Sequence, residues 1–175
     1  MKYLLDFDHT LMDTEALKTQ AFNDGSMALV GTVDFWKHHN VMDFLFSDVR
    51  EWIMSKPKES LHILTAFKPS QGPNACAFQE TKIASGGFSQ LVSSVTVMEG
   101  EKGRYAVKIA KQFSPLSRIV FIDDRPDQCA SVKSHLPDAH CFLMVRYNVC
   151  PSNIPDGVTP VYSLAEVDAT MESLV

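Results

Sequence analysis

The sequence lacks long apolar runs, paired cysteines and clustered histidines. No stretch approaches the roughly 18 apolar residues of a membrane-spanning helix, and Asp6 interrupts the apolar start before a signal-peptide core could form. The four cysteines, Cys76, Cys129, Cys141 and Cys150, form no Cys-x-x-Cys pair, and no histidines stand at zinc-binding spacing. We therefore expect free thiols in a cytoplasmic protein with no membrane association.

Basic residues are fewer than acidic residues. The chain has 16 Lys and Arg against 21 Asp and Glu, a net charge of −5. Strong non-specific binding to nucleic acid needs a basic face, so we expect none. The length of 175 residues, 45% of them hydrophobic, suits a single domain with one core.

Short apolar segments rich in Val, Ile, Leu and Phe predict buried strands, since most lack polar alternation. They lie at 3–7, 61–67, 91–98, 118–123, 141–147 and 160–164. Helical patterns lie at 73–84, 103–113, 125–136 and 163–174. This alternation predicts an α/β fold with a doubly wound, mainly parallel sheet and helices on both faces.

The segment at about 14–58 is longer than one crossover needs. Residues 14–22 and 47–55 read as short helices, and 34–46 is rich in aromatic side chains. One interpretation is a small helical lid at the sheet edge within a single domain spanning 1–175. The alternative is an elaborate connection without a lid function.

Polar side chains follow the first four expected strands. They are Asp6 and Asp8, then Thr65, then Lys102, then Asp123 and Asp124. Because parallel strands present their carboxyl ends at one edge, these groups should meet there. Clustered carboxylates are tolerable around a hard cation such as Mg²⁺. An aspartate that attacks phosphorus, a second acid that moves a proton, and a hydroxyl and ammonium that bind phosphate oxygens would suit phosphoryl transfer.

The motifs "DFDHT", "LTAF", a lysine before a helix, and "FIDDRPD" occur in this order. Together they resemble the haloacid dehalogenase superfamily of phosphohydrolases, and the resemblance extends from Asp6 to Asp124. It implies a Rossmann-like fold, a Mg²⁺ cofactor and an aspartyl-phosphate intermediate. The dehalogenases of this superfamily lack an acid at the position of Asp8, so the resemblance favours a phosphatase or a phosphotransferase.

The resemblance also implies a role for each matching residue. Asp6 is the nucleophile and a metal ligand, and Asp8 is the general acid/base and binds metal through its backbone carbonyl. Thr65 and Lys102 hold the phosphate; Lys108 is a weaker rival for the lysine because it lies inside a helix.

The second acidic pair leaves an open choice. Asp124 aligns with the acid that binds metal, while Asp123 supports Lys102 or a metal-bound water; which of the two contacts the metal is not decided. Near the motifs, Ala66, His9 and Lys68 are expected to line the substrate site.

The room for inserted segments implies a capless or minimally capped member of the superfamily. Such relatives act on accessible phosphates of large substrates or close their site with a neighbouring subunit. The expected partner is therefore a phosphorylated small molecule or an accessible macromolecular phosphate, and a homo-oligomer is possible.

Two further functions stay open: a phosphotransferase, and a non-catalytic phosphate-binding or receiver-like signalling module. A phosphotransferase needs a larger cap to exclude water. A receiver places its phosphorylated aspartate after a middle strand, whereas the middle strands here end in Thr65 and near Glu99.

Overall fold

The computed structural model describes residues 1–114, 118–147 and 149–174, with only the backbone described for Gln71. Its centre is a six-stranded sheet in the order β3-β2-β1-β4-β5-β6, and all neighbouring strands are parallel. The strands are β1 Lys2–Leu5, β2 Leu61–Phe67, β3 Ser94–Glu99, β4 Ile119–Asp123, β5 His140–Met144 and β6 Val158–Val161. The expected parallel α/β sheet is confirmed.

The helices follow the expected alternation. They are α1 Thr14–Asn23, α2 Val49–Met54, α3 Ala75–Ala84, α4 Gly103–Ala110, α5 Pro126–His135 and α6 Leu164–Ser173. Short 3₁₀ helices lie at η1 Met27–Leu29, η2 Phe35–Lys37, η3 Val41–Phe44, η4 Lys58–Ser60, η5 Pro69–Gln71 and η6 Ser85–Leu91. In these described ranges, no helix has the length and the apolar run needed to cross a lipid bilayer.

Helices cover both faces of the sheet because successive strand residues point to opposite sides. On one face, Leu4 of β1 shares a buried cluster with Ala106 of α4 and Val132 of α5. On the other, Leu5 belongs to the cluster that contains Val167 of α6, together with residues of α2 and α3. The sheet is therefore buried on both sides, which explains the unbroken apolar runs of its strands.

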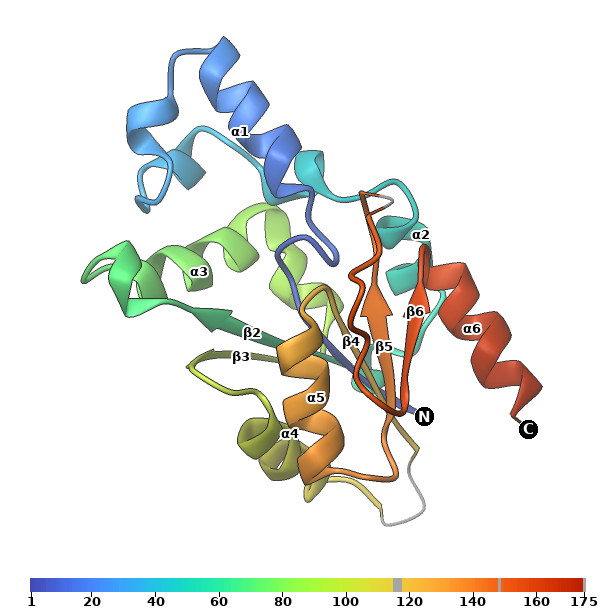
Figure 1. The fold of residues 1–175 in the computed structure, drawn as a ribbon. Helices are drawn as coiled ribbons and strands as arrows, with labels where there is room; N and C mark the ends of the chain where they lie inside the picture. Colours follow the sequence, from blue (N-terminus) through green and yellow to red (C-terminus); the bar gives the residue numbers. More distant parts are fainter. Residues whose placement is uncertain (115–117, 148, 175) are drawn as a thin grey trace.

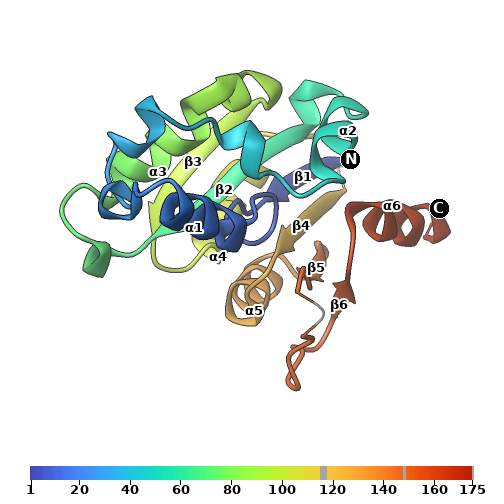
Figure 2. The ribbon, with the colours of Figure 1, turned by 90° about the horizontal axis from the view of Figure 1, so that it is seen from above.

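The first strand of the chain lies in the middle of the sheet, between β2 and β4 (Figure 2). Asp6 therefore follows a middle strand, and the argument against a receiver-like module from strand position was wrong. Beyond Leu5 the backbone leaves the sheet for a tight loop. There the N–H groups of Leu11 and Met12 both donate to the carbonyl oxygen of Phe7 at 2.9 Å. This loop explains why β1 ends earlier than residue 7.

The segment 14–58 divides into two parts. Figure 1 shows α1 and the turns after it at the end of the sheet toward which β5 and β6 point, whereas α2 lies beside α6. Asp168 of α6 accepts hydrogen bonds from Nε1 of Trp52 at 2.9 Å and from Nζ of Lys56 at 2.7 Å. The second part is thus fastened to the fold, and a lid function for the first part stays a prediction.

The four cysteines are free thiols, as expected. Cys129 and Cys141 are buried, whereas Cys150 is exposed. Burial raises the pKa of the Cys129 thiol, so this group is an inert part of the core rather than a nucleophile.

Candidate active site

The base of the site is an ion-pair network around Lys102. This residue directly precedes α4, and its backbone N–H donates to Oε1 of Gln128 at 2.9 Å. Its ammonium contacts the carboxylate of Asp6 and lies 2.6 Å from Oδ2 of Asp123. Burial would lower the pKa of Lys102, but Asp123 and Asp6 raise it. The lysine is therefore charged although only 1% of it is exposed.

Asp6 has two differently bonded carboxylate oxygens. Oδ1 contacts Lys102, and Oδ2 accepts a hydrogen bond of 3.2 Å from the hydroxyl of Thr10. Thr10 is fully buried, and its backbone carbonyl accepts from Nε of Arg146 at 2.9 Å. The loop after β1 is therefore held from two sides, which fixes the orientation of the candidate nucleophile.

The acidic residues after β1 and β4 meet as the sequence predicted. Asp6, Asp123 and Asp124 each place a carboxylate oxygen within 4.8 Å of the other two. Burial and the nearby charge of Asp6 raise the pKa of Asp124, and burial raises that of Asp123. Such a set of hard oxygen donors fits Mg²⁺, which would relieve the repulsion between them.

The two members of the second acidic pair have different surroundings. Asp123 is fully buried, and its oxygens accept from Nζ of Lys102 at 2.6 Å and from the backbone N–H of Arg125 at 2.9 Å. Asp124 is less buried and lines the cavity above the site. These contacts favour Asp124 for direct metal binding and Asp123 for the support of Lys102.

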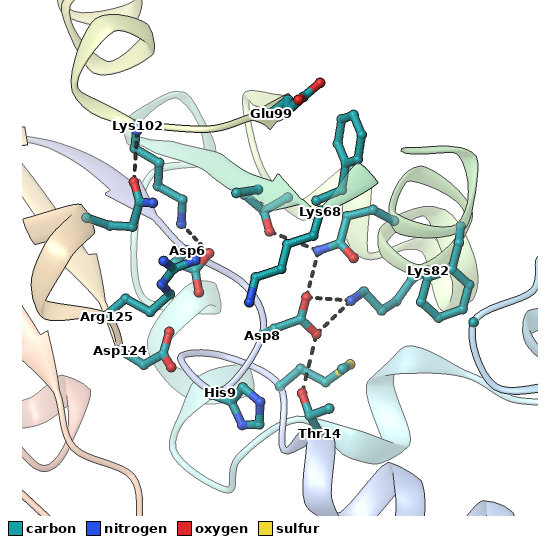
Figure 3. Close-up of a pocket in the computed structure, with 18 of the residues that line it drawn as sticks. Asp6, Asp8, His9, Thr14, Lys68, Lys82, Glu99, Lys102, Asp124 and Arg125 are labelled. Atoms are coloured by element: carbon teal, nitrogen blue, oxygen red, sulfur yellow. Dashed lines mark hydrogen bonds and ion pairs between the residues drawn. The ribbon is translucent and has the colours of Figure 1, made fainter. Parts of the chain in front are cut away.

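Asp8 has a lysine of its own. Nζ of Lys82 on α3 lies 2.6 Å from each carboxylate oxygen of Asp8, and Nε2 of Gln79 donates to Oδ2 at 2.7 Å (Figure 3). The hydroxyl of Thr14 adds a bond of 3.3 Å. Burial would raise the pKa of Asp8, but Lys82 and Gln79 outweigh it and lower the pKa. Asp8 is therefore held as a carboxylate.

Gln79 also connects Asp8 to the end of β2. Its Nε2 lies 2.9 Å from the hydroxyl oxygen of Thr65, which is 1% exposed. Gln79 and Lys82 are both buried, although they are polar residues on a helix. One face of α3 thus fixes the positions of the acid after β1 and the hydroxyl of β2.

The remaining predicted residues also surround one cavity of about 710 Å³ above Asp6 and Asp8, lined among others by Ala66, His9 and Lys68. His9 has a φ of 58°, and its ring lies edge-on to that of Tyr147. Lys68 extends into the space between the two aspartates (Figure 3). Lys108 instead is exposed and lies over the ring of Tyr105, so it is no rival to Lys102.

Sequence reasoning did not identify Gln79 and Lys82. The available signal was helical periodicity: Ala75, Gln79, Lys82 and Ile83 are the buried residues of α3. A glutamine and a lysine on the buried stripe of a helix are rare unless they have partners. That anomaly would have directed attention to α3, but not to Asp8 as the partner.

Comparisons with known proteins show which solved structures have a similar fold. No protein-family model matches the sequence, and no curated protein matches it significantly. Similar solved structures exist: a haloacid dehalogenase-like hydrolase of Burkholderia xenovorans has a TM-score of 0.68 at 16% identity, with 99% of this chain and 97% of that chain covered. The class defined by the fold and site is thus a Rossmann-like α/β protein with an acidic site at the strand ends.

Two more solved structures are similar to this chain over nearly its whole length. The HAD-hydrolase YfnB of Bacillus subtilis, bound to magnesium, gives a TM-score of 0.63 at 13% identity, with 97% of each chain covered. L-2-haloacid dehalogenase of Xanthobacter autotrophicus, with chloropropionic acid covalently bound, gives 0.60 at 8% identity, with 99% of each chain covered. The fold of this chain is that of the haloacid dehalogenase-like hydrolases.

Proposed function

We propose that the chain is a Mg²⁺-dependent phosphatase that hydrolyses phosphomonoesters through an aspartyl-phosphate on Asp6. The observation that carries the proposal is the pair of carboxylates after β1, each bonded to a different buried lysine. Asp6 belongs to the candidate metal cluster, and Asp8 lines the same cavity. This arrangement supplies a nucleophile and a separate proton carrier.

In the first step, a carboxylate oxygen of Asp6 attacks phosphorus, and the bond from phosphorus to the ester oxygen breaks. Asp8 donates a proton to the departing alcohol. In the second step, Asp8 takes a proton from water, whose oxygen attacks phosphorus, and inorganic phosphate leaves as Asp6 is regenerated. The hydroxyl of Thr65 and the ammonium of Lys102 stabilise the charge on the phosphate oxygens.

The ion pair with Lys82 favours the deprotonated form of Asp8, which suits the second step better than the first. This carboxylate is the form of Asp8 that accepts a proton from water. Donation to the leaving alcohol needs the protonated form, so Asp8 has to give up part of its contact with Lys82 on substrate binding. Gln79 would keep the side chain in place during that change.

The acidic cluster at the ends of β1 and β4 would bind the metal. Asp6, Asp124 and the backbone carbonyl of Asp8 would hold Mg²⁺, which supplies positive charge to the phosphate and offsets the repulsion between carboxylates. The remaining ligands of such an ion are commonly water and phosphate oxygens. Asp123 would act through Lys102.

The acid at position 8 separates this proposal from dehalogenation. Carbon–halogen hydrolysis releases a halide, which needs no proton from the enzyme, so its first step gives no acid role to a second carboxylate beside Asp6. A phosphoryl ester releases an alcohol, for which a proton donor accelerates departure by roughly 10²–10⁴-fold. The presence of Asp8 in the same cavity as Asp6 therefore supports phosphate chemistry.

The test is phosphate release from a panel of phosphomonoesters, measured in Mg²⁺ and again in EDTA. We expect turnover in Mg²⁺ only, and loss of turnover in Asp6→Asn with the circular dichroism spectrum unchanged. Turnover by Asp6→Asn at the wild-type rate would overturn the proposal. Transfer of the phosphoryl group to an added alcohol instead of water would favour a phosphotransferase.

A further inference from the structure

Five of the residues that line the cavity above Asp6 and Asp8 are large and apolar. They are Met12, Leu17, Val30, Phe67 and Phe78, which we call the apolar wall. The phosphate-binding groups contribute only the base of a volume of about 710 Å³, which is in the range of sites for whole small molecules. The cavity therefore has room for the alcohol part of an ester as well as for its phosphate.

The apolar wall is built from segments that are fixed to the rest of the fold. The backbone N–H of Asp13, where α1 begins, donates to the carbonyl oxygen of Phe44 at 2.7 Å. Trp36 of η2 is buried, and its ring centroid lies 5.9 Å from that of Phe78 on α3. The backbone N–H of Val41 donates to the hydroxyl of Ser85 at 3.1 Å. The segment that carries Leu17 and Val30 is thus joined to α3 and η6 at these points.

Charged residues of both signs line the cavity. The exposed acids Glu99, Glu101 and Asp127 all line it, and they come from the end of β3, the loop after it and α5. Arg125 is paired with Asp127 at 2.6 Å. Lys18 and Lys68 line the cavity as well, and Lys18 is paired with Glu15 at 2.7 Å. The proposal below therefore depends on the apolar residues of the lining and not on its charge.

We propose that the substrate is a small phosphomonoester whose alcohol part is apolar, an alkyl or aryl group that packs on the apolar wall. This inference rests on the proposed phosphatase function. Sugar hydroxyls placed against Val30, Phe67 and Phe78, the partly exposed members of the wall, would lose water without gaining hydrogen-bond partners. The apolar ester gains affinity on the same surface because its carbon atoms leave water.

The test compares two esters that differ only in polar atoms. Cyclohexylmethyl phosphate has the ring size of glucose 6-phosphate and the same primary leaving oxygen, but no hydroxyl groups or ring oxygen. We expect its kcat/KM to exceed that of glucose 6-phosphate by at least about tenfold. Methyl phosphate, whose alcohol part is too small to fill the cavity, serves as the reference for the chemical step.

A matched pair of variants locates the preference. Val30→Asn places an amide on the apolar wall and should lower the ratio of the two kcat/KM values by roughly tenfold. Val33→Asn is the control, because Val33 is 36% exposed and does not line the cavity; it should leave the ratio unchanged. Equal kcat/KM values for the two esters, or equal ratios in both variants, would overturn the inference.

The failure of the phosphatase proposal can be recognised separately. If none of the three esters is turned over, that proposal fails, and binding to Asp6→Asn by calorimetry still tests the apolar wall. There the inference expects cyclohexylmethyl phosphate to bind at least about tenfold more tightly than glucose 6-phosphate. Equal binding of both would overturn it.

Discussion

Both carboxylate oxygens of Asp8 lie 2.6 Å from the ammonium nitrogen of Lys82, which is 74 residues away in the chain. Asp6 has a different lysine, Lys102, which precedes another helix. Each acid of the motif after β1 therefore has its own buried cation. This pairing lets two carboxylates stand close together in ionised form, and it gives α3 a part in the proposed reaction.

Replacement of Lys82 tests the role of α3. In Lys82→Met the ammonium is lost, and Asp8 is held only by Gln79 and Thr14. We expect kcat to fall by roughly 10- to 100-fold, less than the roughly 10²–10⁴-fold that general acid–base catalysis supplies, because Asp8 itself remains; the change in KM should be smaller. Steady-state kinetics on the best ester measures both constants. Lys82→Arg should recover part of kcat because it keeps a charge at this position.

The matched control for Lys82→Met is Lys108→Met, since Lys108 is an exposed lysine on α4. Its kcat should equal that of the wild type. If Lys82→Met is folded and has the wild-type kcat, the ion pair has no part in catalysis.

Replacement of Asp8 separates the two chemical steps. In Asp8→Asn the side chain neither donates a proton to the alcohol nor accepts one from water, so both steps slow. We expect kcat to fall by roughly 10²–10⁴-fold, with phospho-enzyme persisting long enough for detection by intact-protein mass spectrometry. Normal turnover by Asp8→Asn would remove Asp8 as the acid/base.

Lys102 is expected to stabilise the fold as well as the phosphate. In Lys102→Met, Asp6 and Asp123 keep their buried positions but lose the cation between them. Breaking a buried ion pair from one side costs about 3–5 kcal/mol, and urea unfolding in EDTA measures this. A loss below about 1 kcal/mol, as for an ordinary surface change such as Lys108→Met, would contradict the expected dependence of these carboxylates on Lys102.

The acidic cluster predicts how stability depends on pH when metal is absent. The pKa values of Asp123 and Asp124 are raised in the folded chain, whereas the unfolded chain loses these protons near the ordinary pKa of about 3.9. The folded state therefore binds protons more tightly. Protonation of Asp123 and Asp124 therefore stabilises the folded state. This stabilisation is complete below the pKa of the unfolded chain, and it is lost as pH rises through the pKa values of the folded chain.

Mg²⁺ should reverse that loss, because it binds the ionised carboxylates of the folded state. We expect Mg²⁺ to raise Tm more at about pH 8 than at about pH 5, measured by circular dichroism against EDTA. A larger rise at the lower pH would contradict metal binding by this cluster. Asp8 has the opposite effect on the pH dependence of stability. Because its pKa is lowered in the folded chain, it stabilises the fold above the ordinary pKa of an aspartate, and this stabilisation is lost as pH falls through the folded pKa.

Much of the site could be predicted from the sequence because strand ends in a parallel sheet meet at one edge. Asp6 follows an apolar run, Thr65 lies in one, and Lys102 follows the end of β3 by a short loop, so the sheet topology brings them to one edge. The boundaries were less predictable: β1 stops at Leu5 because the following loop bonds to the carbonyl oxygen of Phe7. Apolar character alone does not signal such a loop.

The contacts of Asp8 could not be predicted in the same way. Lys82 reaches Asp8 from a helix between two strands, and the rotation of that helix depends on packing by Ile83 and its neighbours. The apolar side of the cavity likewise depends on how residues after Asp13 fold back over α3. Sequence patterns indicate which residues are apolar, but not that Val30 and Phe78 line the same cavity.

The most direct test of the central claim is peptide mapping of the phosphate. The protein is mixed with its best ester in Mg²⁺, quenched in acid within one turnover, digested and analysed by mass spectrometry. The account predicts phosphate on the carboxylate of Asp6, and none in the Asp6→Asn variant. Turnover with no phosphate on Asp6 at any quench time, or with phosphate on another residue, would contradict it.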